Sequence, residues 1–208
     1  DPASTTFQRS EMTRLAREKH RIAWSQTWVD GDRISVHLKR AVIASEDAGF
    51  VDHLGADWEA MDKAWERNRQ QQARAAARPG RATRLRGGST ITQQLAKNLL
   101  LSGERTVARK AQELVLAFAL EALLGKQRIL ELYLNHVEWG EGLFGAQAAA
   151  RHYFGVDAAR LGPEQAARLA VMLPAPKRFE RQPRSEYLMS RSATILARMG
   201  AVELPQSR

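Results

Sequence analysis

The sequence predicts a mainly α-helical fold, and three observations favour this class. Apolar residues recur at helical spacing, glycine and proline stand where helices are expected to begin and end, and no run of alternating strands is found. The 44% of apolar residues, with 5 Trp and 6 Phe, suffices for a core. A length of 208 residues corresponds to one substantial domain.

The N-terminal part contains a basic, loosely amphipathic segment over 13–24 and a second helix that begins near Val36. Gly49 is expected to end this second helix, which places Glu46 and Asp47 in its C-terminal turn. The helix dipole disfavours negative charge at that end. The acid pair is therefore an exception to this rule that raises the question of a function.

Asp57 is expected to cap a helix that runs to about residue 77. This helix has an apolar stripe at positions i, i+3 and i+7, namely Trp58, Met61 and Trp65. The stripe is equally compatible with packing in the core and with a helix that lies on an anionic membrane. The stretch 70–84, rich in Gln, Ala and Arg, is predicted to be a basic loop or a frayed helix end.

A glycine turn at 87–88 precedes a helix over 91–101, for which Ser89 or Thr90 is the expected cap. Ile91, Leu95 and Leu99 share one side of this helix. The polar residues on its other side are predicted to face outward, and these are Gln93, Gln94 and Lys97.

The longest apolar run lies in a helix predicted over 105–124. Its second half, 114–124, is apolar all round except for Glu121, so we expect it to be buried. Its first turns carry Arg105, Arg109 and Glu113 along one stripe. Further helices are expected over 126–135, from Pro163 to Pro174, and over 185–199, with a glycine-rich loop around 140–145.

The composition restricts the possible partners and chemistries. With 32 basic and 23 acidic side chains the net charge is +9, which favours nucleic acid, a phosphate-bearing ligand or an acidic lipid surface. The absence of cysteine excludes thiol catalysis and disulfides, and the five histidines lack the spacing of a zinc site. The turn at 87–90 lacks the P-loop pattern, so nucleotide binding is not indicated.

Acids and cations in the middle of the chain together indicate a transferase that handles a diphosphate. Such a leaving group departs as an anion, so the enzyme needs positive charge around it and one base that activates the nucleophile. Glu46 or Asp47 could be the base if burial raises its pKa. Four residues could supply the charge, namely Lys97, Arg105, Arg109 and Lys110. Taken singly, each cation could equally be solvated or part of a surface ion pair.

Five ordered segments resemble the motifs of the peptidoglycan glycosyltransferases, the transglycosylase module of class A penicillin-binding proteins. Residues 46–55, EDAGFVDHLG, resemble E-D-x-x-F-x-x-H-x-G, and 87–98, GGSTITQQLAKN, resemble the second motif. Arg109, Lys110 and Glu113 resemble R-K-x-x-E. Residues 126–135, KQRILELYLN, resemble the fourth motif, and 142–155 resemble the fifth.

This resemblance implies a lysozyme-like helical lobe with a small membrane-proximal jaw subdomain at about 57–84, all within one domain over 1–208. It also implies that the enzyme polymerises lipid II into β-1,4-linked glycan strands with inversion and releases undecaprenyl diphosphate. The partners would be lipid II, the lipid-linked glycan, the bacterial inner membrane and proteins of cell-wall synthesis or division, with no nucleic acid. We expect a location on the periplasmic face of the inner membrane, with an anchor upstream of Asp1; a piece of a longer protein is the other explanation for such a chain.

The resemblance also assigns roles to single residues. Glu46 would be the general base, and Glu113 the second acid that assists at the donor site or orients the cations. Lys97 and Arg105 would hold the diphosphate, with Arg109 and Lys110 as further cations. The donor site would be lined by Ser89, Gln93, Gln94 and Asn98. A divalent metal, Mg²⁺ or Mn²⁺, on the diphosphate is a family expectation without a readable ligand set, and no organic cofactor is expected.

Two other functions compete with this interpretation. A muramidase or lytic transglycosylase would cleave the same polymer, but hydrolases protonate a sugar leaving group, usually with two opposed carboxylates, and need no stripe of cations. A basic helical module that binds nucleic acid would account for the net charge but would leave Glu46 and the paired glutamines without a role.

Overall fold

The computed structural model describes residues 3–20, 22–76, 88–101 and 106–206, and confirms the mainly α-helical class. The α-helices in this part of the chain are α1 (Thr6–Lys19), α2 (Val36–Glu46), α3 (Trp58–Ala76), α4 (Ile91–Leu100), α5 (Val107–Leu123), α6 (Lys126–His136), α7 (Ala146–Phe154), α8 (Pro163–Met172), α9 (Pro176–Arg181) and α10 (Glu186–Arg198). The strands are β1 (Ser25–Gln26), β2 (Glu138–Gly140) and β3 (Leu143–Phe144), and short 3₁₀ turns are η1 (Gly31–Arg33), η2 (Ala158–Arg160) and η3 (Met199–Ala201).

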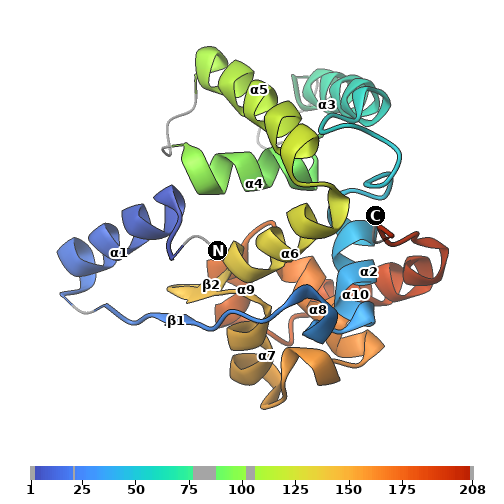
Figure 1. The fold of residues 1–208 in the computed structure, drawn as a ribbon. Coiled ribbons are helices and arrows are strands. Elements are labelled where there is room, and N and C mark those ends of the chain that lie inside the picture. Colours follow the sequence, from blue (N-terminus) through green and yellow to red (C-terminus); the bar gives the residue numbers. More distant parts are fainter. Residues whose placement is uncertain (1–2, 21, 77–87, 102–105, 207–208) are drawn as a thin grey trace.

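Two groups of helices lie one above the other (Figure 1). α3, α4 and α5 form the upper group, and the lower lobe contains α2, α6 to α10 and the sheet. α4 contacts α5 above it and α6 below it, so it connects the two groups. α1 lies to one side against α4, where the Thr6 hydroxyl donates a hydrogen bond of 2.9 Å to the Leu99 carbonyl.

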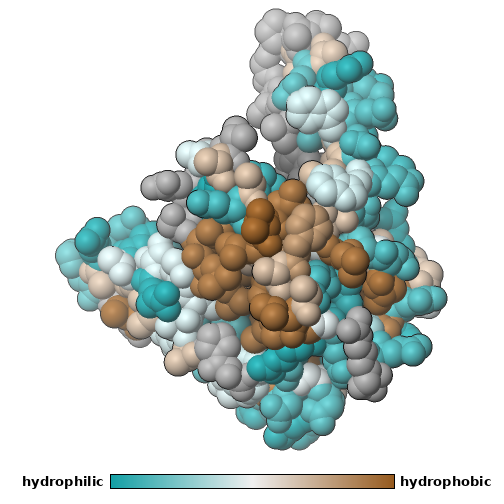
Figure 2. Space-filling view, turned by 45° about the horizontal axis from the view of Figure 1, so that its top comes forward, coloured by the Kyte–Doolittle hydropathy of each residue, from teal (hydrophilic) through white to brown (hydrophobic). Residues whose placement is uncertain are grey.

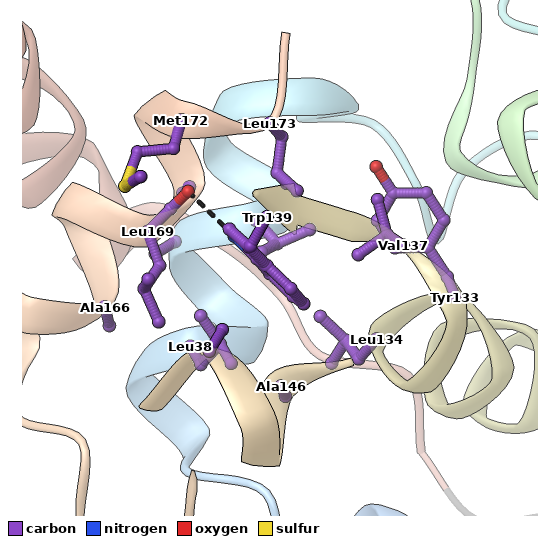
Figure 3. Close-up of a cluster of buried hydrophobic side chains, with 14 of the residues drawn as sticks. Leu38, Tyr133, Leu134, Val137, Trp139, Ala146, Ala166, Leu169, Met172 and Leu173 are labelled. Atoms are coloured by element: carbon purple, nitrogen blue, oxygen red, sulfur yellow. Dashed lines mark hydrogen bonds between the residues drawn. The ribbon is translucent and has the colours of Figure 1, made fainter. Parts of the chain in front are cut away.

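The lower lobe is built on α2, which packs against α8 and α10. Its core surrounds Trp139, a fully buried residue of β2 (Figure 3). The indole Nε1 donates a hydrogen bond of 3.0 Å to the Leu169 carbonyl, which satisfies the one polar atom of this ring. The labelled apolar side chains around it come from α2, α6, α7 and α8, so this cluster joins helices that are distant in sequence.

The three strands form a small sheet in the order β1-β3-β2, with β1 parallel and β2 antiparallel to β3. The sequence predicts only a glycine-rich loop here, because strands of two or three residues are too short to show alternation. Gly142 turns the hairpin with a φ of +71°, and a Cβ there would lie 2.0 Å from the Ala23 carbonyl oxygen. Only glycine is compatible with this turn.

Most of the predicted helix boundaries are confirmed within one or two residues. Asp57 Oδ1 accepts a hydrogen bond of 2.8 Å from the Ala60 amide at the start of α3, and Pro163 is the first residue of α8. The segment predicted over 13–24 forms α1, which begins and ends earlier than expected. α2 ends at Glu46 rather than at Gly49, because the Asp47 carboxylate is held outside the helix by contacts described below.

The prediction that residues 114–124 are buried is wrong. α5 contacts α4 and the loop at Gly55, and its outer face stays open to solvent. Val115 is 66% exposed, Phe118 40% and Leu123 80%. Figure 2, in which the top of the molecule comes forward, shows hydrophobic residues gathered on one face.

The two tryptophans of the α3 stripe are also exposed, Trp58 by 57% and Trp65 by 73%. These exposures exclude the first interpretation of the stripe, in which the two tryptophans pack in the core. α3 covers most of the predicted jaw at 57–84, whereas residues 77–84 lie outside the described residues. In the part of the chain that the structure describes, no helix has the length and hydropathy required to cross a bilayer.

Candidate active site

The end of α2 presents two neighbouring carboxylates that have different surroundings. Both oxygens of Asp47 are engaged: Oδ1 lies 2.9 Å from His53 Nε2, and Oδ2 accepts a hydrogen bond of 2.9 Å from the backbone amide of Ile91. That amide belongs to the first turn of α4, where a carboxylate is favoured by the helix dipole. Asp47 therefore ties the loop after α2 to the start of α4, and His53 contributes to this contact.

Glu46 faces the space between α2, α4 and α6. Ser45 Oγ lies 3.3 Å from its Oε1, and Gln94 Nε2 donates a hydrogen bond of 3.1 Å to its Oε2. Burial of the carboxyl group raises the pKa of Glu46, and the charge of Asp47 adds to this. The hydrogen bonds from Gln94 and Ser45 and the charge of Lys97 oppose the shift without cancelling it. A carboxylate with a raised pKa suits a general base better than an ordinary one.

Gln94 is itself held by Tyr133, whose hydroxyl donates a hydrogen bond of 2.9 Å to Gln94 Oε1. Tyr133 lies on α6 and is only 1% exposed. Sequence reasoning missed this residue as part of the site. The signal that could have found it is a hydroxyl-bearing ring in the stretch 129–134, which is apolar apart from Glu131.

A second polar cluster lies between α4 and α5. Lys110 Nζ donates hydrogen bonds to Ser89 Oγ at 3.0 Å and to Gln93 Oε1 at 3.4 Å, and it forms an ion pair with Glu113. Arg109 Nη2 lies 3.7 Å from the other carboxylate oxygen of Glu113. Glu113 is buried, and a buried carboxylate needs partners of opposite charge, which these two cations provide.

Two buried donors of this second cluster have no hydrogen-bond partner among the described residues, namely Gln93 Nε2 and Arg109 Nη1. Leaving such groups unpaired is costly, and an anionic ligand with several oxygens could satisfy both. Gln93 is 1% exposed, so the prediction that it faces outward is wrong. Packing of α5 over α4 buries it, whereas the next residue, Gln94, contacts the lower lobe.

Thr90 rather than Ser89 caps α4. Its Oγ1 accepts a hydrogen bond of 3.1 Å from the Gln93 amide and donates one of 2.7 Å to the Gly55 carbonyl. Ser89 is thereby left to bind Lys110.

Three more residues are predicted for the site from the sequence, namely Lys97, Asn98 and Arg105. Lys97 is exposed on α4, three residues beyond Gln94, and its charge acts on the Glu46 carboxylate. Asn98 is buried on the same helix. Arg105 lies outside the described residues, as does Gly87 of the predicted turn.

The residues that the structure describes do not form a metal site. Within residues 3–20, 22–76, 88–101 and 106–206 no group of three or more His, Asp or Glu side chains could hold an ion. Both oxygens of Asp47 are used by His53 and Ile91, and Glu113 is paired with Lys110 and Arg109. The divalent metal therefore stays a prediction, and no step below depends on it.

Comparison with known proteins gives a consistent result. The family model described as Transglycosylase matches residues 12–200. A protein named biosynthetic peptidoglycan transglycosylase from Bordetella avium (strain 197N) is 55% identical over 205 residues, which cover 99% of this chain and 83% of that protein. Proteins of the same name from Paraburkholderia xenovorans (strain LB400) and Burkholderia thailandensis (strain ATCC 700388 / DSM 13276 / CCUG 48851 / CIP 106301 / E264) are each 50% identical, covering 99% and 100% of this chain and 81% and 77% of theirs.

Proposed function

Because the chain belongs to the transglycosylase family, we propose that it polymerises lipid II with Glu46 as the general base. The chain is a peptidoglycan glycosyltransferase of cell-wall synthesis. The observation that carries the proposal is the position of Glu46, a largely buried carboxyl group with a raised pKa that accepts a hydrogen bond from Gln94, the residue next to Gln93 of the cationic second cluster.

In the proposed reaction, Glu46 takes the proton from the 4-hydroxyl of the acceptor sugar. The oxygen attacks the anomeric carbon of the donor glycan, the bond from that carbon to the diphosphate breaks, and the electron pair leaves with undecaprenyl diphosphate. Attack from the face opposite the leaving group inverts the anomeric centre and gives the β-1,4 linkage. The leaving group is already an anion, so no general acid is required.

The second cluster is proposed to hold the donor diphosphate. Lys110 and the two unpaired donors, Gln93 Nε2 and Arg109 Nη1, offer positive charge and hydrogen bonds to phosphate oxygens. Glu113 binds both cations and so fixes where their charge lies. Ser89, Lys97, Asn98 and Arg105 are proposed to complete this site.

The arrangement favours synthesis over hydrolysis. A glycoside hydrolase usually needs two carboxylates that face the scissile bond. Here Asp47 and Glu113 are engaged by hydrogen bonds and ion pairs, and burial raises the pKa of Glu46, the third acid of the site.

A peptidoglycan transglycosylase acts in the cell envelope. We place this enzyme on the periplasmic face of the inner membrane, because its substrate carries a lipid. The exposed apolar residues of α5, Val115, Phe118 and Leu123, here called the apolar surface, would contact the bilayer. Trp58 and Trp65 of α3 are suited to the lipid interface.

The test of the proposed base is Glu46→Gln, assayed for polymer formation from lipid II. We expect activity to fall by at least about 1,000-fold while thermal unfolding stays cooperative, since the amide keeps the shape but cannot accept the proton. Glu164→Gln, an exposed residue of α8, is the matched control and should retain wild-type activity. A Glu46→Gln enzyme with most of its activity would remove the assigned base, and cleavage of finished glycan without polymerisation would replace synthesis by hydrolysis.

A further inference from the structure

A series of two hydrogen bonds connects α6 to the Glu46 carboxylate through α4. The Tyr133 hydroxyl donates to Gln94 Oε1 at 2.9 Å, and Gln94 Nε2 donates to Glu46 Oε2 at 3.1 Å. Figure 3 shows Tyr133 beside Val137, at the edge of the buried cluster around Trp139. The ring is therefore held by the core of the lower lobe, and its hydroxyl is directed at the neighbouring helix.

The chemistry of Tyr133 and Gln94 determines which group donates and which accepts in each of these two hydrogen bonds. A glutamine amide has one end that donates and one that only accepts, and reversing it exchanges the two. Burial, together with the charges of Glu46 and Asp47, raises the pKa of Tyr133 well above its ordinary value. The hydroxyl therefore stays protonated at any working pH and keeps a proton to donate. With Oε1 engaged by that hydroxyl, Gln94 must turn its NH₂ group toward Glu46.

We propose that Tyr133 is a positioning residue for the proposed reaction, whose hydroxyl fixes the Gln94 amide so that Gln94 donates to Glu46 and keeps this carboxylate unprotonated and oriented. The proposal rests on Glu46 being the base. Ser45 Oγ holds the other oxygen, so the two hydrogen bonds together set the orientation of the carboxylate.

The reversed amide would have the opposite effect on the base. An amide oxygen directed at Glu46 repels the carboxylate and accepts a hydrogen bond from the protonated acid. The described charged and titratable groups that act on Glu46 are Asp47 on its own element, Lys97 from α4 and Tyr133 from α6. Burial and Asp47 already raise the pKa of Glu46, so losing the Gln94 donor raises it further.

The variant that tests the proposal is Tyr133→Phe, which removes one hydroxyl and keeps the ring. The measurement is kcat/KM for lipid II as a function of pH. We expect the acidic limb to move to higher pH by about one unit, so that kcat/KM on that limb falls about tenfold. We expect KM to change by less than about twofold, because Tyr133 does not touch substrate in the proposal.

Tyr153→Phe is the matched control. Its hydroxyl donates a hydrogen bond of 2.7 Å to the Trp139 carbonyl in the same lobe. Removing it therefore deletes one partly buried hydrogen bond, as Tyr133→Phe does, but leaves the contacts of Gln94 unchanged. We expect its pH profile to equal that of the wild type. A Tyr133→Phe profile that coincides with the Tyr153→Phe profile would overturn the proposal.

A double-mutant cycle with Gln94→Met tests whether Tyr133 acts through Gln94. We expect the double variant to be no less active than Gln94→Met alone, because the hydroxyl has no effect once the amide is absent. Losses that multiply would contradict the proposal. If Tyr133→Phe does not fold, the pH profile of Gln94→Met tests the proposal instead. An acidic limb of kcat/KM at the wild-type position in Gln94→Met would overturn it.

The outcome for Glu46→Gln separates this inference from the proposed function. An active Glu46→Gln enzyme removes the base itself. An inactive Glu46→Gln enzyme together with an unchanged Tyr133→Phe profile removes only the role of Tyr133.

Discussion

Glu46 and Asp47 are adjacent residues of similar chemistry, yet tertiary contacts give them different tasks. Asp47 binds His53 and the Ile91 amide, which leaves it no oxygen for chemistry. Glu46 accepts a hydrogen bond from Gln94 and has a carboxyl group whose pKa is raised by burial. The residue types alone identify the pair without choosing between its members, and only the family resemblance assigns the base to Glu46, because the partners of Asp47 lie 6 and 44 residues away.

Glu138 gives a prediction about stability at the residue scale. Burial raises its pKa from 4.5 to about 7, with Glu11 adding to this and Lys177 opposing it. A carboxyl group with a raised folded-state pKa stabilises the fold in its protonated form. This stabilisation is complete below about pH 4.5, declines as pH rises and is lost above about pH 7.

We therefore expect Glu138→Gln to be less sensitive to alkaline pH than the wild type. Between pH 5 and pH 8, urea unfolding should show the variant gaining about 2 kcal/mol relative to the wild type. Glu164→Gln, at an exposed position, should parallel the wild type at both pH values. Equal pH dependence of Glu138→Gln and wild type would contradict the raised pKa.

At the scale of elements, α4 is the helix on which the proposed site depends. One of its neighbouring glutamines contacts the cationic cluster under α5, and the next contacts Glu46 and α6. Successive residues of a helix are about 100° apart, so one short helix can contact both groups of residues. The prediction of an outward polar face is confirmed for Lys97 and wrong for Gln93, because a single sequence does not show that α5 packs over this part of α4.

The cap of α4 is therefore expected to matter for stability. Thr90→Ala removes a buried hydroxyl that accepts from the Gln93 amide and donates to the Gly55 carbonyl. We expect a loss of about 2 kcal/mol in the free energy of unfolding, measured in urea. Thr106→Ala removes the corresponding cap of α5 at an exposed position and should cost about 0.5 kcal/mol. Equal losses for both caps would show that burial of the Thr90 hydroxyl adds nothing.

At the scale of the whole molecule, the apolar surface of α5 distinguishes this chain from an ordinary soluble domain. Leu54 lies in the loop that packs on Ala117, and it is 73% exposed. Large side chains of this kind gain free energy when they leave water. A membrane next to this face would cover them and would bring the lipid-linked substrate close to the proposed site.

Replacing Val115, Phe118 and Leu123 together by Ser should weaken binding to vesicles of phosphatidylethanolamine and phosphatidylglycerol by about 100-fold, if each side chain loses about 1 kcal/mol of partial burial. Sedimentation with the vesicles measures this. The matched control replaces three apolar residues that are exposed outside α5 by Ser as well, namely Ile22, Met189 and Leu196, and it should bind as the wild type does. Equal binding of both triple variants would exclude the apolar surface as the membrane contact.

By itself the sequence determined the helical class, most helix boundaries, the family and the candidate base. These depend on periodicity, caps and short motifs, which are set by residues close together in the chain. Only the tertiary structure decided that Asp47 is structural, that Gln93 and Gln94 serve different clusters, that Tyr133 joins the site and that one face of α5 is open. The contacts from Gln94 to Glu46 and to Tyr133 span 48 and 39 residues, and such pairs depend on how whole helices pack, which no local pattern encodes.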